Sequence, residues 1–338
     1  MNKKIQKDLG DFHFRNIHPD IFLGTCSDRY AGWIGQVYNQ ERYGGRINSR
    51  TRVLAGKTYY EEVLPVDSVI EYFQHFPLLE LDFTFYRPLL DSEGKPTSNY
   101  HVLTSYRQHF KDTDRVIIKV PQAVIARKLR RGQKFITNPN YLDADFFVRS
   151  FYDPAVEILG SHLCGFIFEQ EYQRKNEQEN PEMLAVDLSR FFYEVPQDDR
   201  YHIEIRTGRL LGESLFEALR PLGIGQVLSH WTWLPTLEEQ FEKSGNEVLN
   251  RDGIQVIRLL TPRNMNYTKS FDKAFPFNRM VDGLLRDNML DDTVKIIKSV
   301  IHQGKRIFIL INNRFGGNAP QTGRILVERL EADGVLSQ

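Results

Sequence analysis

Acidic residues alternate with apolar residues in segment 79–88 of this 338-residue chain. Glu80 and Asp82 fall on one side of the alternation, and Leu81 and Phe83 fall on the other. A period of two residues is typical of a β-strand with different chemistry on its two faces. Because carboxylates are seldom buried without partners, the pattern predicts a strand whose polar face lines the mouth of a closed parallel barrel.

Further polar side chains stand near the carboxyl ends of other predicted strands. They are Lys119, Glu204, Arg206, Arg258 and Asn312. Carboxylates and cations that converge in partly desolvated space shift one another's pKa values, which general acid–base catalysis requires. We therefore expect Asp82, Lys119 and Glu204 to be the catalytic groups. The alternative is an internal salt-bridge network that satisfies polar residues in the upper layer of the barrel.

Contacts with a ligand are expected from the residues around these strand ends. The charged candidates are Glu80, Arg87, Arg206 and Arg258, and the aromatic candidates are Tyr30, Trp33 and Tyr86. The arginines suit an anion or a developing negative charge, and Arg87 together with the aromatic rings would form a rim for a ring or a phosphate. The aromatic side chains could equally form a cap over the barrel.

The segment after the last predicted strand predicts an anion site. Asn312, Asn313, Gly316 and Gly317 connect that strand to a final helix that we expect to begin near Pro320. Consecutive glycines let backbone N–H groups approach a ligand, and a helix N-terminus adds partial positive charge. Barrels frequently bind phosphate in this place. The alternative is a tight turn in which the two asparagines satisfy neighbouring backbone groups.

These residues must be positioned by alternating strands and helices. Strand-like segments occur at 21–26, 79–88, 115–121, 164–170, 201–206, 224–230, 254–260 and 306–312, with helical segments between them and no hairpin signal. Alternating β and α units imply a parallel sheet, and eight of them favour a (β/α)₈ TIM-type barrel over a doubly wound open sheet.

The loops and termini fit one barrel domain over residues 1–338. Long strand-to-helix loops are predicted at 27–65, 121–140, 171–180 and 261–283. Barrel enzymes elaborate the loops at this end of the strands, where their sites lie. We expect a core over about 21–334, an N-terminal arm at 1–19 and an insertion at 27–65 in the first of these loops.

The composition is that of an ordinary soluble protein without a charge bias. The 44 basic and 44 acidic residues cancel, so bulk electrostatics favour neither nucleic acid nor an anionic membrane. No apolar run approaches the length of a membrane span, and residues 5–14 lack the apolar core of a signal peptide. The two cysteines, Cys26 and Cys164, fit a reducing compartment. We therefore expect a cytoplasmic protein without a membrane partner, in which Cys26 packs as a small buried residue.

A basic segment stands after the third predicted strand. It contains Arg127, Lys128, Arg130, Arg131 and Lys134. Such a segment could hold a phosphodiester backbone, so nucleic acid is the alternative partner to a small anionic molecule. In a chain of neutral total charge, a solvated charge run is the favoured interpretation.

Metal binding has weak support. Paired cysteines and the His-Glu-x-x-His pattern are absent, and only His202 and His230 fall on predicted strands. A site made of His230, Glu204 and Asp82 is conceivable but is not favoured. The sequence does not indicate a cofactor.

Many of these positions match the pattern of a known family. In chain order they are Gly24, Thr25, Tyr30, Trp33, Tyr38, Glu80, Thr84, Phe85, Tyr86, Arg87, Lys119, Pro121, Glu204, Arg206, Arg258, Asn312 and Asn313. The series resembles the YecE-like family, also called domain of unknown function 72. Cys26, Ser27 and Asp28 replace the Ser-Gly-Trp of its opening turn, so the chain resembles a divergent member. The resemblance implies a TIM barrel of undetermined activity, distantly similar in architecture to endonuclease-IV-like and sugar-isomerase-like barrels.

The favoured hypothesis is an enzyme whose barrel mouth binds a small anionic, phosphorylated or sugar-like molecule and uses acid–base chemistry. The alternative is a nucleic-acid-binding or phosphodiester-processing barrel.

Overall fold

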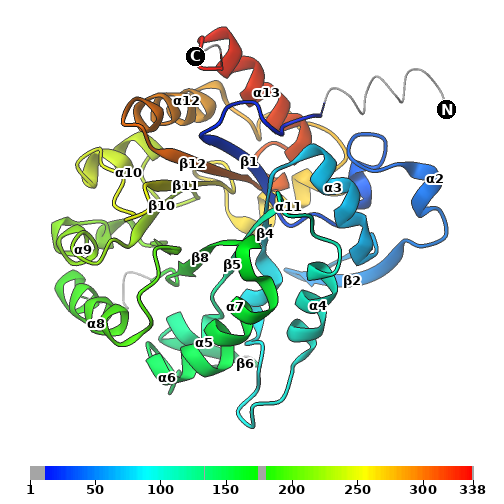
Figure 1. The fold of residues 1–338 in the computed structure, drawn as a ribbon. Coiled ribbons are helices and arrows are strands. Elements are labelled where there is room, and N and C mark those ends of the chain that lie inside the picture. The colour runs from blue at the N-terminus through cyan, green and yellow to red at the C-terminus, as the bar shows by residue number, and fades with distance from the viewer. Residues whose placement is uncertain (1–11, 133, 174–179, 337–338) are drawn as a thin grey trace.

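Eight parallel strands form a closed barrel in the computed structural model, which describes residues 12–132, 134–173 and 180–336 (Figure 1). Around the barrel, the strands are β1 (Ile21–Cys26), β12 (Arg306–Ile311), β11 (Ile254–Leu259), β10 (Gly225–His230), β9 (Tyr201–Glu204), β8 (Leu163–Glu169), β5 (Arg115–Lys119) and β4 (Leu78–Leu81). The first strand closes the barrel by pairing in parallel with both β12 and β4. The predicted (β/α)₈ barrel is therefore confirmed, and the alternative of an open sheet is wrong.

Most helices surround the strands as an outer ring, whereas α11 lies near the centre of the view (Figure 1). The helices are α2 (Gln40–Tyr43), α3 (Val69–His75), α4 (Ser98–Arg107), α5 (Gln122–Ile125), α6 (Ala144–Phe147), α7 (Asp153–Leu159), α8 (Pro181–Glu194), α9 (Glu213–Leu219), α10 (Leu237–Lys243), α11 (Tyr267–Ala274), α12 (Asp287–His302) and α13 (Ala319–Ala332). A π-helical turn at Val148–Tyr152 joins α6 to α7.

Alternate residues of each strand divide the core into two layers. One apolar cluster lies inside the barrel and includes Leu78, Ile117 and Val256. The larger cluster lies between the strands and the helices and includes Ile118 and Ile257, their neighbours in sequence. The period of two therefore determines which side chains reach the interior of the barrel.

The predicted strand at 79–88 ends earlier than the alternation indicates. Strand β4 stops at Leu81, and Asp82–Tyr86 form a 3₁₀ helix. The hydroxyl group of Thr84 stabilises this turn, because it lies 3.0 Å from the carbonyl oxygen of Leu81. Glu80 therefore belongs to the strand, whereas the next acidic residue belongs to the helix.

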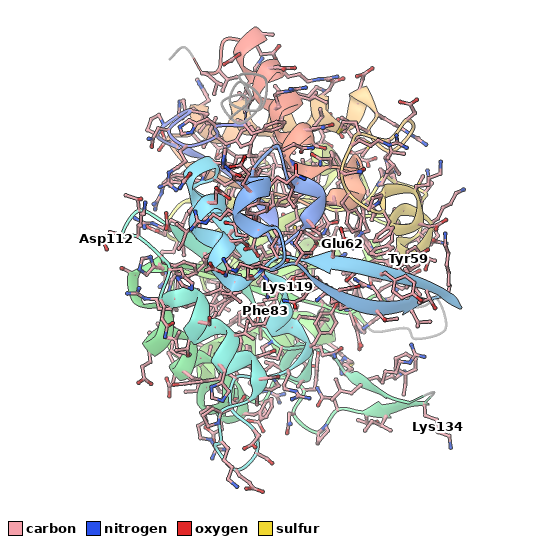
Figure 2. The ribbon with its side chains drawn as sticks, turned by 90° about the vertical axis from the view of Figure 1, so that its right-hand side faces the viewer. Tyr59, Glu62, Phe83, Asp112, Lys119 and Lys134 are labelled. Carbon is pink, nitrogen blue, oxygen red and sulfur yellow. The ribbon has the colours of Figure 1, made fainter. Side chains whose placement is uncertain are left out.

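Two antiparallel hairpins lie in the long loops, so the expectation of no hairpin is wrong. Strand β2 (Asn48–Leu54) pairs with β3 (Lys57–Val63) through a turn at Ala55 and Gly56, whose φ angles are 49° and 81°. Strand β6 (Lys128–Arg131) pairs with β7 (Lys134–Thr137). Figure 2 shows both hairpins projecting on the same side of the molecule.

None of the helices in the described part of the chain combines the length and the apolar character that a membrane span requires. Residues 1–11 of the expected N-terminal arm lie outside the described part of the chain, and Phe12 and Phe14 are buried in the core.

The contact between β1 and β4 at Gly24 provides a test of barrel closure. A Cβ atom at Gly24 would stand 2.2 Å from the carbonyl oxygen of Leu78, so Gly24→Ala must separate the two strands. We expect this substitution to lower the free energy of unfolding, measured by urea denaturation, by about 2–3 kcal/mol or more. The matched control is Gly44→Ala, because its Cβ would lie 3.7 Å from its nearest neighbour. Equal stability of the two variants would contradict the packing.

Candidate functional site

Six charged side chains form a buried layer at the carboxyl end of the barrel, here named the ionic layer. They are Glu80 on β4, Lys119 on β5, Glu169 on β8, Glu204 on β9, Arg206 just after β9, and Arg258 on β11. Arg258, for example, lies two residues after the inward-facing Val256 and so also points inward. The layer holds as many carboxylates as cations, and Lys119 lies near the middle of the molecule in Figure 2.

Arg258 joins carboxylates from different sides of the ionic layer. Its Nε and Nη2 donate to the two oxygens of Glu80 at 2.9 and 2.5 Å, which is a bidentate pair. Its Nη1 pairs with Glu204 and lies 3.3 Å from Glu169. Burial alone would lower the pKa of Arg258, but the facing carboxylates raise it well above its usual range, so the side chain stays charged.

Glu169 is the carboxylate at which the cations meet. Its Oε2 accepts hydrogen bonds from Lys119 Nζ at 2.5 Å and from Arg206 Nη2 at 2.6 Å. Burial alone would raise the pKa of Glu169, but the surrounding cations hold it well below its usual range. This residue was not among the predicted site residues. Its place at a strand end, two residues after the inward-facing Ile167, is the same signal that identified Lys119.

Glu204 completes the layer through contacts with its neighbours. The hydroxyl group of Ser229 donates to its Oε1, and Arg206 Nε lies 3.2 Å from the same oxygen. The guanidinium group of Arg206 stacks 4.3 Å from the ring centre of Trp231. Glu204 and Lys119, both expected to be catalytic, therefore have ion-pair partners inside the barrel, as the salt-bridge alternative predicts.

Asp82 differs from the other carboxylates at the mouth. It follows the end of β4 and, within the described residues, makes no ion pair or side-chain hydrogen bond. Burial and the negative charge of Glu80 raise its pKa, while Lys119 and Arg258 oppose this shift. A partly exposed carboxyl group without a fixed partner can exchange a proton with a bound molecule.

Asp82 lines a cavity of about 680 Å³ beside the mouth. The loop after β1, the hairpin β2–β3, the first turn after β4 and helix α4 contribute most of its walls. Its charged lining consists of Arg29, Arg50, Glu61, Glu62 and Asp82. The volume falls within the range of about 300–1,000 Å³ that is usual for small-molecule sites.

Both arginines of the cavity wall are already engaged. Arg29 Nε donates to the carbonyl oxygen of Leu64 at 2.5 Å, and Arg50 Nε donates to Glu61 at 2.6 Å. With three carboxylates against two guanidinium groups, the cavity favours a neutral or hydroxyl-rich ligand over an anion.

The predicted aromatic and guanidinium rim is divided between two environments. Tyr30 lines the cavity and packs 5.0 Å from Trp33, which is fully buried. Tyr86 is 69% exposed, and Arg87 is also exposed. Trp33 therefore supports the barrel core, whereas Tyr30 faces the space that a ligand would occupy.

The asparagines after β12 have structural partners. Asn313 Oδ1 accepts from Trp33 Nε1 at 3.1 Å and from the backbone N–H of Ala319 at 2.8 Å. Asn312 Oδ1 accepts from the backbone N–H of Arg314 at 3.1 Å and so caps a short 3₁₀ turn. These contacts match the tight-turn alternative.

The glycines of the same loop are required by close packing. A Cβ at Gly316 would stand 2.5 Å from Thr322 Oγ1, and a Cβ at Gly317 would stand 2.6 Å from the carbonyl oxygen of Arg279. The final helix is capped by Asn318, whose side chain accepts from its first turn. The geometry of this loop therefore gives no support to the predicted anion site, because other parts of the chain occupy the space around the glycines.

The conceivable metal site does not form. His230 Nδ1 lies 2.8 Å from the carbonyl oxygen of Thr261, and its ring packs edge-on against Phe315. Glu204 points into the barrel from the opposite face of the sheet, so the two side chains do not converge. The described ranges contain no group of three His, Cys, Asp or Glu residues that could hold a metal ion.

The two cysteines are separate thiols. Cys26 donates to Glu80 Oε2 at 3.2 Å, and burial, followed by the charge of Glu80, raises the pKa of this thiol well above its usual range. Cys164 donates to the carbonyl oxygen of Val116 at 3.2 Å. Cys26 therefore supports Glu80 as a buried donor.

The basic segment 127–134 is mostly hairpin. Arg127 Nη2 pairs with Asp187 at 2.8 Å, and its guanidinium group lies 4.4 Å from the ring centre of Tyr141. Lys128, Arg130 and Arg131 lie on β6 and Lys134 begins β7, while residue 133 lies outside the described residues. Lys128, Arg130 and Lys134 have exposed side chains.

Comparison with known proteins assigns the chain to a family. The model of a family described as "Protein of unknown function DUF72" matches residues 49–337. The chain belongs to the DUF72 family. The resemblance inferred from the sequence is therefore confirmed.

Solved structures of two other DUF72 proteins have a similar fold. The protein from Thermotoga maritima has a TM-score of 0.55 at 12% identity, covering 93% of this chain and 99% of that chain. The protein from Enterococcus faecalis has a TM-score of 0.53 at 13% identity, covering 92% of this chain and 94% of that chain. At these identities the likeness concerns the fold alone. No curated protein sequence matches this DUF72 chain.

Removal of Arg258 tests how far the ionic layer supports this DUF72 fold. Arg258→Met leaves Glu80 buried without a guanidinium partner and leaves Glu204 with Arg206 alone, and we expect a loss of about 3–5 kcal/mol in the free energy of unfolding. The control is Lys298→Met, which removes a surface pair with Asp333 and should cost about 0–1 kcal/mol. Urea denaturation measures both, and similar losses for the two variants would contradict the assigned role.

A buried carboxyl group beside the cavity predicts a pH dependence. Asp28 is fully buried, its Oδ1 accepts from the hydroxyl group of Tyr106 at 2.8 Å, and its Oδ2 has no partner in the described residues. Burial raises the pKa of Asp28 from 3.8 to about 6. Folding therefore favours the protonated form, so this group lowers stability as the pH rises from about 4 to about 6, and the full cost persists above that range.

Asp28→Asn removes this titration. The unfolding free energy of the variant minus that of the wild type should increase by roughly 2–3 kcal/mol between pH 4 and pH 8, since one pKa unit corresponds to about 1.4 kcal/mol. Urea denaturation at several pH values measures the difference. A difference that stays constant with pH would show that Asp28 is not protonated in the folded state.

Proposed function

We propose that this DUF72 protein is an enzyme that binds a small sugar-like molecule in the cavity beside the barrel mouth and transfers a proton through Asp82. The observation that carries the proposal is the position of Asp82, a carboxyl group of raised pKa that lines the cavity without an ion-pair partner in the described residues. A general acid–base group works best when its pKa is brought towards the working pH.

The walls of the cavity favour a hydroxyl-rich ligand. Tyr30, Tyr60 and Phe83 offer aromatic faces against which the apolar side of a sugar ring can pack. Glu62 and Asp82 offer acceptors for hydroxyl groups, and Asn99 Oδ1 offers a further acceptor, because Asn99 Nδ2 already donates to the carbonyl oxygens of Phe83 and Arg87. Because the carboxylates of the wall outnumber its arginines, a neutral sugar is favoured over its phosphate.

The ionic layer would adjust the chemistry of Asp82 without touching the ligand. Lys119 and Arg258 favour the ionised form of Asp82, whereas burial and Glu80 favour the protonated form. Opposing influences of this kind keep both protonation states accessible, so that the carboxyl group can take a proton from one atom of the ligand and return it to another. Two contacts hold Lys119 in position. Its Nζ donates to Glu169 Oε2 at 2.5 Å and lies 4.0 Å from the ring centre of Phe85.

Nucleic-acid binding is the second candidate, and one observation favours it. The hairpin β6–β7 exposes Lys128, Arg130 and Lys134 together with Phe135, which is 61% exposed. Basic side chains beside an exposed aromatic ring suit a single strand, whose bases stack on aromatic faces. Such binding would weaken steeply with salt, whereas binding of a neutral sugar would not.

Asp82→Asn tests the enzyme proposal. Aldoses, ketoses and sugar phosphates are screened by calorimetry, and deuterium uptake from heavy water into each bound sugar is followed by nuclear magnetic resonance. We expect the variant to keep ligand affinity within a few-fold and to lose exchange by about 10²–10⁴-fold, the usual contribution of an acid–base group. Its stability should change little, because no ion pair is lost.

The control is Asp112→Asn, because Asp112 is exposed and lies on the side of the molecule away from the hairpins (Figure 2). This variant should exchange deuterium at the wild-type rate. Exchange that survives in Asp82→Asn would exclude Asp82 as the proton carrier. Salt-sensitive binding of single-stranded oligonucleotides, in the absence of any sugar binding, would favour the second candidate.

A further inference from the structure

Two adjoining hollows lie on the part of the rim formed by the loops after β8, β9, β10 and β11, and Arg263 lines both of them. The smaller hollow has a volume of about 150 Å³, and the larger, more open one has a volume of about 410 Å³. Asp82 and the other charged residues of the proposed sugar cavity line neither hollow. These hollows therefore form a separate place where a ligand could bind.

The smaller hollow is lined by two arginines. Arg263 and Arg286 make no ion pair within the described residues. Arg286 directly precedes helix α12, which has no side-chain cap at its N-terminus, so the unpaired N–H groups of its first turn add to the positive potential. The volume is below the range of about 300–1,000 Å³ for whole drug-sized ligands, and it suits one anionic group.

The same hollow also contains acceptors. His230 is 3% exposed, and its Nδ1 lies 2.8 Å from the carbonyl oxygen of Thr261, so Nδ1 carries the hydrogen that is donated there. The Nε2 atom of this neutral ring is left as an acceptor without a hydrogen bond in the described residues. Asp292 supplies a carboxylate on the wall. Two guanidinium donors beside two acceptors suit an oxyanion that carries a hydrogen atom of its own, and a phosphate group has such a hydrogen whereas sulfate has none.

The larger hollow offers an aromatic surface. Trp233 is 57% exposed and Tyr172 is 45% exposed, and their ring centres lie 6.5 Å apart. Both rings line the hollow that continues from Arg263. Exposed tryptophan faces bind planar rings and the apolar faces of sugars by stacking. An organic group attached to an anion between the arginines would lie over this surface.

We propose that the two hollows form one binding site for a phosphate monoester, with the phosphate between Arg263 and Arg286 and a ring of the organic part on Trp233. The site is independent of the assignment of Asp82. Its ligand is recognised by three features together, which are the negative charge, the hydrogen on the phosphate and the attached ring. Loss of any one of them should weaken binding.

Calorimetry with four probes at pH 6 tests these features. The probes are adenosine monophosphate, inorganic phosphate, inorganic sulfate and adenosine, and at this pH roughly half of a monoester keeps its phosphate hydrogen. We expect adenosine monophosphate to bind most tightly, phosphate to bind more weakly, and sulfate and adenosine to bind at least about tenfold more weakly than phosphate. Absence of saturable binding by adenosine monophosphate and phosphate at millimolar concentrations would overturn the proposal, as would equal affinities for phosphate and sulfate.

Variants separate the parts of the site. Arg263→Gln and Arg286→Gln should each weaken adenosine monophosphate by about tenfold or more, because each removes a charge-assisted hydrogen bond. Trp233→Ala should weaken adenosine monophosphate but leave inorganic phosphate unchanged. Asp292→Asn should remove the preference for phosphate over sulfate. Circular dichroism confirms the fold of each variant, and wild-type affinity in both arginine variants would overturn the proposal.

Two control variants complete the experiment. Arg220→Gln removes an exposed arginine of similar type on another part of the surface, and it should bind adenosine monophosphate like the wild type. Asp82→Asn should also bind it like the wild type, so that failure of the sugar-site proposal and failure of this one are distinguished. Weakening by Arg220→Gln equal to that by Arg263→Gln would indicate non-specific attraction and overturn the proposal.

Discussion

The bidentate contact between Arg258 and Glu80 constrains the whole barrel. The two residues are 178 positions apart in the chain, and each projects from its strand into a space with almost no solvent. A shift of either strand by one residue would turn the charged side chain towards the apolar layer under the helices. That layer offers no group to pair with the charge. The contact therefore couples the register of β4 to that of β11, and the strands between them must keep a register that is compatible with both.

Burying the ionic layer costs free energy, and a gain in stability does not by itself explain why the chain has this layer. A buried network of carboxylates and cations is often no more stable than an apolar layer of equal volume, because each charge must be removed from water. Most barrels fill this level with branched apolar residues. Here the layer instead places fixed positive charges of Lys119 and Arg258 close to Asp82, the carboxyl group that lacks an ion-pair partner in the described residues. Under the proposed function, these charges would serve as an electrostatic environment for that one group.

Features with local causes were predictable from the sequence, and features with distant causes were not. The strands are short apolar runs, so their number and order followed from periodicity, and the inward position of Glu80 followed from the same alternation. The early end of β4 depends on a hydroxyl contact of Thr84, which no period of two reveals. Gly316 and Gly317 suggested an open loop, but their neighbours come from elsewhere in the chain and fill the space. The inward position of Glu169 also follows from alternation, because it stands two residues after Ile167 on the same strand.

Two places on the rim of the barrel differ in local charge, although the net charge of the chain is zero. On the side of β1 and β4, Glu61, Glu62 and Asp82 outnumber the arginines, which are themselves engaged. Across the strand order, Arg263 and Arg286 face a small hollow with a single carboxylate. Since fields of opposite sign attract different ligands, the two proposed sites would select hydroxyl groups at the first place and a phosphate at the second. A net charge of zero therefore does not exclude local fields of either sign at the barrel rim.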